Sequence, residues 1–205
     1  MRGTLAGKTV AVLGGSSPHG AAAARELGRQ GANVALGGRD RQRLEELEEE
    51  IRAHGGEALV VGVHLAKRHH PAHLVAAAVE TFGGLDVLLY MASAAAPPLG
   101  SPDLDAWERS LDVNVRGFLY CLAAALPAMR ERGGGHVVMV GVEDSRGTRD
   151  PLLRAWRAAV GTILEELPQE LCADGIRAAE VGLSARQAGD PEECARKIVH
   201  ALVDP

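Results

Sequence analysis

The stretch Lys8-Thr9-Val10-Ala11-Val12-Leu13-Gly14-Gly15-Ser16-Ser17-Pro18-His19-Gly20, followed by the alanine-rich segment 21–30, decides the fold of this chain. An apolar run, a glycine-rich turn and a helix-forming segment in this order are typical of the first β–α unit of a doubly wound sheet. Such a turn brings backbone N–H groups and the positive end of a helix dipole to one point, where a pyrophosphate can bind. The stretch therefore predicts a dinucleotide site that includes Gly14, Ser16, Ser17 and Gly20.

Composition limits the classes of protein that the chain can belong to. With 205 residues, of which 46% are hydrophobic, it can bury one good core, so we expect a single domain over 1–205. A formal net charge of -5 argues against nucleic acid as a partner. No apolar run approaches the ~20 residues that span a bilayer, and no signal peptide precedes the first strand. With three scattered cysteines, these features predict a cytoplasmic protein without a disulfide framework.

Segments typical of strands and helices alternate along the whole chain. Short Val/Leu runs bounded by glycine predict buried parallel strands, and longer segments with apolar residues three and four apart predict helices. The predicted strands are 9–13, 33–36, 58–63, 86–91, 136–140 and 177–181. The predicted helices are 21–30, 41–54, 71–82, 103–130, 152–173 and 191–202. Six β–α units with right-handed crossovers predict an α/β fold, a Rossmann-like three-layer sandwich with strand order 3-2-1-4-5-6.

Six segments, in the right order and at the right spacing, resemble the motifs of the short-chain dehydrogenase/reductase family. VLGGSSPHG is similar to its TGxxxGxG turn, FGGLDVLLYMAS to GxxDxLVNNAG, and LDVNVRG to VNxxG. GGGHVVMVG is similar to the GxIVNISS strand, RAAVGTILEELPQEL to the helix that carries YxxxK, and DGIRAAEVGLS to GIRVNxVxPG. The resemblance covers nearly the whole chain. It implies a nicotinamide cofactor across the carboxyl ends of the strands.

The resemblance also implies an Asn–Ser–Tyr–Lys set that moves a hydride and a proton between the cofactor and a carbonyl or alcohol. Asn114 matches the asparagine, but the serine, tyrosine and lysine positions hold Val142, Leu153 and Arg157. No YxxxK occurs anywhere in the chain, and leucine cannot donate a proton. Arg157 can still hydrogen-bond a ribose. We therefore expect a degenerate family member, a pseudoenzyme that acts as a binding or subunit-stabilising protein.

Substitutions also fall in the half of the fold that holds the cofactor. Pro18 removes one N–H donor from the turn, and larger side chains in Tyr90-Met91-Ala92-Ser93 replace Asn-Asn-Ala-Gly where the cofactor's ribose would lie. His64 stands at the position of the family's adenine-binding aspartate. Gly38-Arg39 after the second predicted strand resembles the family's NADP-type pattern, in which a guanidinium is available for a 2′-phosphate and no acidic residue binds a ribose 2′-OH. If a dinucleotide binds, we expect NADP(H), held also by Ala92 and Asn114.

Other interpretations of these residues remain open. An oxidoreductase with a proton donor foreign to the family would keep NADP(H). Glu143, with Asp144, is alternatively the base of a cofactor-free dehydratase or isomerase, or part of a solvated loop. Asn114 is either retained for catalysis or a relic that hydrogen-bonds backbone. Four histidines cluster in one segment: His64, His69, His70 and His73. They indicate a solvated loop rather than a metal site, because no cysteine or carboxylate joins them.

The end of the chain supports the loss of activity. Only 183–189 separate the last predicted strand from the last helix, so we expect no substrate lid and no seventh strand. By family resemblance, helices 103–130 and 152–173 form the subunit interface. We therefore expect a homodimer or homotetramer, or pairing with a related subunit.

Overall fold

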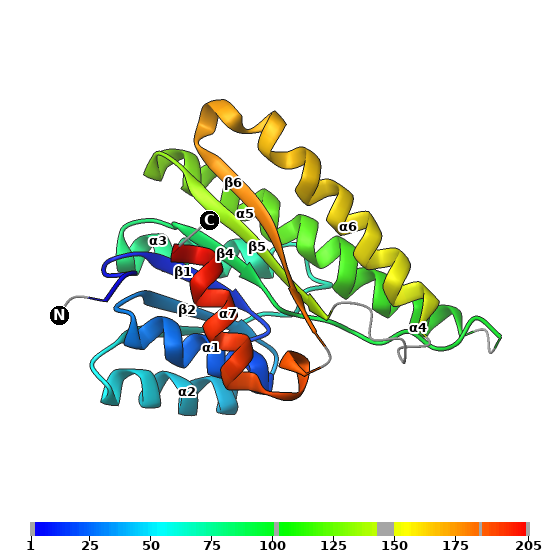
Figure 1. Cartoon of the computed structure of the whole chain (residues 1–205), viewed down its shortest axis with the longest axis horizontal. Coiled ribbons are helices and arrows are strands. Elements are labelled where there is room, and N and C mark those ends of the chain that lie inside the picture. Colours follow the sequence, from blue (N-terminus) through cyan, green and yellow to red (C-terminus); the bar gives the residue numbers. More distant parts are fainter. Residues whose placement is uncertain (1–2, 101–102, 143–149, 185, 204–205) are drawn as a thin grey trace.

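The computed structural model describes residues 3–100, 103–142, 150–184 and 186–203. Within them, six parallel strands form one sheet in the order β3-β2-β1-β4-β5-β6, which confirms the predicted order (Figure 1). The strands are β1 (Thr9–Leu13), β2 (Asn33–Gly38), β3 (Glu57–Gly62), β4 (Val87–Tyr90), β5 (Gly135–Val142) and β6 (Ile176–Leu183).

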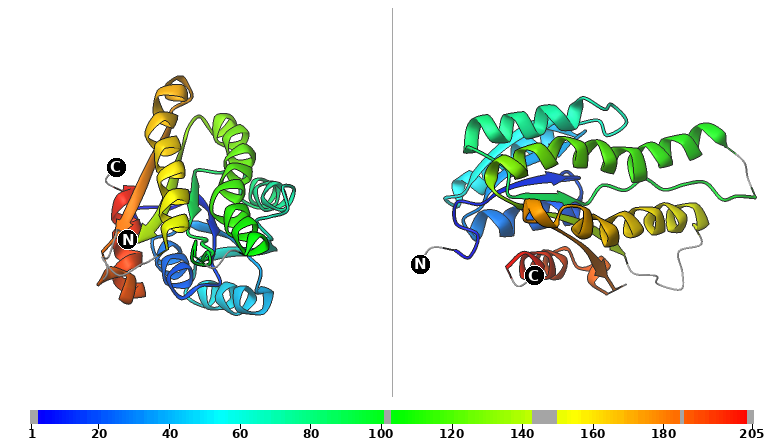
Figure 2. Two further views of the ribbon diagram at one scale, coloured as in Figure 1. Left: turned by 90° about the vertical axis from the view of Figure 1, so that its right-hand side faces the viewer. Right: turned by 90° about the horizontal axis from the view of Figure 1, so that it is seen from above.

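Helices cover both faces of the sheet, as Figure 2 shows from two sides. One face carries α1 (Pro18–Arg29), α2 (Arg41–Ala53) and α7 (Pro191–Val203). The other carries α3 (His70–Phe82), α5 (Gly117–Arg132) and α6 (Pro151–Glu170). Shorter elements are α4 (Leu104–Leu111), the π-helical turn η1 (Asp112–Arg116), and the 3-10 turns η2 (Cys172–Asp174) and η3 (Gln187–Gly189).

Each central strand contributes to two hydrophobic cores. Val10 and Val12 of β1 pack with α1, α2 and α7, whereas Ala11 and Leu13 pack with α3, α5 and α6. Successive side chains of a strand point to opposite faces, and both faces of this sheet are covered. The strands consequently read as unbroken apolar runs, which is why they were predictable.

Two predicted helices differ most from those in the structure. The segment predicted as one helix over 103–130 consists of α4 and α5, which are joined by η1. At this turn the Tyr90 hydroxyl donates to the Val113 carbonyl, and the Asn114 amide donates to the Ser110 carbonyl. The predicted helix 152–173 ends at Glu170 and is followed by η2, before Gly175 takes a φ of 65°. In the described part of the chain, no helix combines the length and apolarity needed to cross a membrane.

Candidate functional site

Two glycines allow β1 and α1 to approach closely at the turn between them. Gly14 has a φ of 94°, and a Cβ there would lie 2.9 Å from the backbone nitrogen of Ala92. A Cβ on Gly20 would lie 2.2 Å from the carbonyl oxygen of Gly14. Both positions therefore exclude larger residues, and the turn is built as the sequence predicts.

The first turn of α1 keeps backbone donors although it contains a proline. The Ser17 hydroxyl caps the helix by accepting from the Gly20 N–H at 3.0 Å, and it donates to the Gly14 carbonyl at 2.9 Å. Pro18 occupies a position at the helix start where its missing N–H would have no intrahelical partner. The structure assigns no hydrogen bond within the described residues to the backbone N–H of His19. This end of α1 therefore still offers a positive dipole and a free donor to an anion.

Ser16 and Arg39 come together at the carboxyl end of β2. A Cβ on Gly38 would lie 3.2 Å from the Ser16 hydroxyl, so this serine lies against the end of the strand. Arg39 follows directly and is exposed, without an ion pair to any described residue. The neighbouring Asp40 caps α2 by accepting from the Arg43 N–H. One guanidinium and one hydroxyl are thus open to a ligand here.

The histidine cluster lies just beyond β3. The His64 N–H donates to Nδ1 of His70 at 3.0 Å, and the rings of His69, His70 and His73 have centroids 4.8 to 6.4 Å apart. Burial and the neighbouring charges of His69 and His73 lower the pKa of His70. No group of three or more potential metal ligands forms among the described residues.

Tyr90 at the end of β4 faces the protein core. Its side chain is 2% exposed, its hydroxyl donates to the Val113 carbonyl, and its ring meets Phe118 edge-on with centroids 5.5 Å apart. Burial raises the pKa of Tyr90 well above its ordinary value. Its hydroxyl is therefore engaged by η1, while Tyr90 still contributes to the lining of the adjoining cavity, and the expectation that it fills the ribose space stays a prediction. Met91 and Ser93 do line the adjoining cavity.

Asn114 holds the segment that follows β4. Its amide nitrogen donates to the carbonyls of Ala94 at 2.7 Å and Ser110 at 2.9 Å, and its amide oxygen accepts from the Ala94 N–H at 3.2 Å. The residue is 8% exposed. A further bond joins the amide nitrogen to the Ser110 hydroxyl at 3.0 Å, so Asn114 links α4 to the segment after β4. Its role as a retained catalytic residue or a relic stays a prediction.

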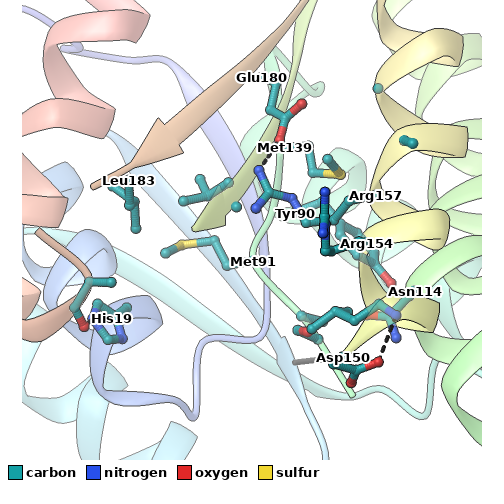
Figure 3. Close-up of a pocket in the computed structure, with 18 of the residues that line it drawn as sticks. His19, Tyr90, Met91, Asn114, Met139, Asp150, Arg154, Arg157, Glu180 and Leu183 are labelled. Carbon is teal, nitrogen blue, oxygen red and sulfur yellow. Dashed lines mark hydrogen bonds and ion pairs between the residues drawn. The ribbon is translucent and has the colours of Figure 1, made fainter. Parts of the chain in front are cut away.

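A cavity of about 810 Å³ opens at the carboxyl ends of the strands, between α6 and the ends of β4, β5 and β6 (Figure 3). It reaches from Ser17 and His19 at the glycine turn to Thr162 and Glu165 on α6. The His19 ring bonds through Nε2 to the Ala188 carbonyl at 2.9 Å, which joins the turn to η3. The predicted dinucleotide turn and the predicted catalytic positions thus share one cavity.

Leu153 and Arg157 both line this cavity, but the arginine is tied to the sheet. Its Nη2 donates to Oε1 of Glu180 on β6 at 2.5 Å, and Figure 3 shows the side chain directed toward that carboxylate. A Cβ on Gly141 would lie 2.7 Å from the guanidinium, so the glycine makes room for it. Arg157 is therefore held over β5, paired to an acid, and not presented to a ligand as a free cation.

Sequence reasoning missed Glu180. A signal was available, because Glu180 is a carboxylate near the carboxyl end of a predicted strand, the edge of the sheet at which sites of α/β proteins form. Reasoning also missed Asp150, whose carboxylate accepts from the Leu153 N–H and from the Ala96 N–H, both at 2.9 Å. Asp150 thereby starts α6 and secures the loop after β4.

Some predicted residues fall outside this geometry. Glu143 and Asp144 lie outside the described residues, as does the side chain of Val142. Their proposed roles stay predictions. Ala92 lines the cavity beside Gly14, and its role in binding a cofactor stays a prediction.

Comparison with known proteins agrees with the fold. A family model described as short chain dehydrogenase matches residues 8–188. The glycine betaine reductase of Emericella nidulans is 34% identical over 231 residues; the match covers 100% of this chain but only 18% of that protein. An uncharacterised oxidoreductase of Staphylococcus saprophyticus is 30% identical over 220 residues, covering 98% of this chain and 93% of the relative.

Solved structures give the same result. The crystal structure of a metagenomic short-chain oxidoreductase in complex with NADP is 26% identical, with a TM-score of 0.88 over 98% of this chain and 93% of that one. A dehydrogenase/reductase from Sinorhizobium meliloti is 25% identical, with a TM-score of 0.86 over 97% of this chain and 88% of that one.

Proposed function

The chain belongs to the short-chain dehydrogenase family of oxidoreductases, and from that premise we propose that it binds NADP(H) but lacks the family's hydride transfer. In this proposal it acts as a binding or subunit-stabilising protein of the cytoplasm. The single observation that carries the proposal is the Arg157–Glu180 pair over Gly141, beside Leu153.

The glycine turn and its surroundings support the binding half. Gly14 and Gly20 let the turn pack tightly against neighbouring backbone, and the His19 N–H at the start of α1 has no partner among the described residues. Ser16 and Arg39 would hold a 2′-phosphate, which favours NADP(H) over NAD(H). A similar solved structure contains NADP. When bound, a nicotinamide cofactor supplies hydride chemistry.

The far side of the cavity supports the loss of activity. A proton donor is needed where Leu153 stands, and a cation beside it would lower the pKa of that donor. Arg157 instead neutralises Glu180, and Tyr90 keeps its proton because it is buried with its hydroxyl bonded to backbone. Neither described side chain performs the family's proton transfer.

Exposed apolar residues on the helices support a role in binding another subunit. The helical stretch from α4 to α5 lies beside α6 in both views of Figure 2, and exposed leucines mark it: Leu104 is 68% and Leu119 is 40% exposed. We propose that these helices form a homodimer or homotetramer, or bind a related subunit.

Calorimetric titration with NADPH and NADH tests the binding half. We expect submillimolar NADPH affinity that Arg39→Gln weakens roughly tenfold, the loss of one charge-assisted phosphate contact. NADH binding should not change, and Arg43→Gln, an exposed arginine of the neighbouring helix, serves as the matched control. Absence of NADPH binding to the wild type contradicts the proposal.

A panel of small carbonyl and alcohol substrates tests the catalytic half. We expect no change in NADPH absorbance with any of them. Turnover would overturn this half and favour an oxidoreductase with a different proton donor. Turnover without cofactor that Glu143→Gln abolishes would favour the acid–base enzyme.

A further inference from the structure

A second cavity, of about 280 Å³, lies at the opposite end of the sheet. Val87 and His136 at the starts of β4 and β5 line it, together with Leu202 near the end of α7. The first cavity opens where these strands end. The two cavities are therefore separated by the length of the strands, and the proposed function does not use the second one.

The charged side chains that line this second cavity are cationic with one exception among the described residues. Lys8, Arg132 and Arg177 line it, and Asp86 is the one carboxylate among its described lining residues. Asp86 Oδ1 lies 2.9 Å from Lys8 Nζ, and Asp86 Oδ2 lies 3.6 Å from Arg132 Nε. Oδ2 also accepts from the Thr9 N–H at 2.9 Å. Asp86 is thus shared by two cations, and Arg177 has no acidic partner in the described part of the chain.

His136 provides an independent sign of a ligand. The residue is only 5% exposed, yet its buried Nδ1 has no hydrogen-bond partner among the described residues. A buried polar atom of this kind is costly unless a ligand or water satisfies it. Burial, and then the charge of Arg177, lowers the pKa of His136 to about 4, so the ring is neutral at pH 7.

Glycines shape the walls and hold Arg132 in place. A Cβ on Gly84 would lie 2.8 Å from Cδ of Arg132, and the guanidinium donates to the Gly83 carbonyl at 3.3 Å. A Cβ on Gly134 would lie 2.7 Å from the Gly175 carbonyl oxygen. Side chains at these positions would displace Arg132 or separate the two loops, so the cavity depends on their absence.

We propose that this cavity binds a phosphate group through Lys8, Arg132, Arg177 and His136. Three cations exceed the one carboxylate, which disfavours a metal ion and favours a dianion. Guanidinium groups offer forked donors that match the oxygens of phosphate. The volume admits inorganic phosphate or the phosphate end of a small phosphomonoester.

Calorimetric titration of the full chain with inorganic phosphate, at constant ionic strength, tests the proposal. We expect Arg177→Gln to weaken phosphate binding roughly tenfold, because it removes one charge-assisted contact. Arg177 is exposed, so the variant should fold. Arg196→Gln removes the same charge from an exposed position on α7 that does not line the cavity, and it should bind like the wild type.

The Arg39→Gln variant distinguishes phosphate binding at the glycine turn from phosphate binding in the second cavity. If phosphate binding is lost in Arg39→Gln and retained in Arg177→Gln, phosphate binds at the glycine turn and the proposal is overturned. Absence of binding to the wild type in the millimolar range overturns it as well. NADPH affinity should be unaffected by Arg177→Gln, so the failure of either proposal is seen independently of the other.

The imidazole resonance of His136 gives a direct readout. Bound phosphate, which is still an anion at the pH of this titration, should raise its pKa from about 4, because it would offset the charge of Arg177. Lys8, Arg132 and Asp86 are the other charged groups that line the cavity. An unchanged titration of His136 on saturation with phosphate contradicts the proposal. Parallel titration with glycerol 3-phosphate distinguishes the two sources: tighter binding of the ester indicates a phosphorylated metabolite, and tighter binding of the free ion indicates phosphate itself.

Discussion

Single residues decide the chemistry of this member of the family. Leucine at position 153 has no proton to donate, whatever surrounds it. Arg157 keeps the charge of a lysine, but its reach and planar fork let it cross Gly141 to Glu180. The substitution at 157 is therefore coupled to residues on two neighbouring strands. The identity of Leu153 alone is enough to predict that position 153 donates no proton. The ion pair of Arg157, in contrast, became visible only in the structure.

At the same scale, His136 should make stability depend on pH. Its pKa is lowered to about 4 in the folded protein, so between about pH 4 and 6.5 the unfolded chain binds a proton that the folded chain does not. The free energy of unfolding should accordingly fall as the pH falls through this range. Urea unfolding in phosphate-free buffers should show a weaker decrease for His136→Gln. His200→Gln, at an exposed position, is the control; equal slopes for all three proteins would rule out this role.

At the scale of elements, boundaries were predictable where capping and turn residues set them. β1 matches its predicted range of 9–13, and glycines end several helices in the left-handed conformation. The start of α1 was predicted three residues late, because Ser17 caps the helix and Pro18 begins it. The π-turn η1 was not predictable, since it depends on a hydroxyl from β4 and on bonds between Asn114 and the loop after β4.

Gly20→Ala tests the close packing between β1 and α1. The new Cβ would lie 2.2 Å from a backbone oxygen that cannot move aside without displacing the turn. We expect a loss of about 1–3 kcal/mol in the free energy of unfolding, comparable to overpacking in a core. Gly62→Ala is a matched control, because its Cβ meets nothing within 4 Å. Similar stabilities of the two variants, measured by urea denaturation, would show that α1 is not held as described.

At the scale of the whole molecule, the described structure has a cavity at each end of the sheet. Every parallel strand begins at one edge and ends at the other, so strand-end residues gather in two places. The carboxyl edge holds the glycine turn, Leu153 and Arg157, whereas the amino edge holds Lys8, Asp86 and His136. The cluster at the carboxyl edge follows from the family's motifs, whereas the cluster at the amino edge became visible only in the folded chain.

Oligomerisation belongs to this scale too. If α5 and α6 form the interface, Leu119→Glu should shift the protein toward monomer in sedimentation velocity, because a charge would be buried in an apolar contact. Val203→Glu is the control, since both residues are 40% exposed and Val203 lies on α7. A wild-type monomer, or an equal effect of both variants, would refute this interface.

The sequence by itself determined the α/β class, the strand order and the glycine turn, and it predicts that Val142, Leu153 and Arg157 stand at the family's serine, tyrosine and lysine positions. These features depend on residues that are close together in the sequence, because apolar runs, turn glycines and motif spacing each extend over a few positions. The tertiary structure alone decided what the altered residues do instead. Arg157 pairs with Glu180 across 23 positions, His19 reaches Ala188 across 169, and Asn114 binds Ala94 across 20. Such contacts depend on which strands and helices become neighbours, and no local pattern records that.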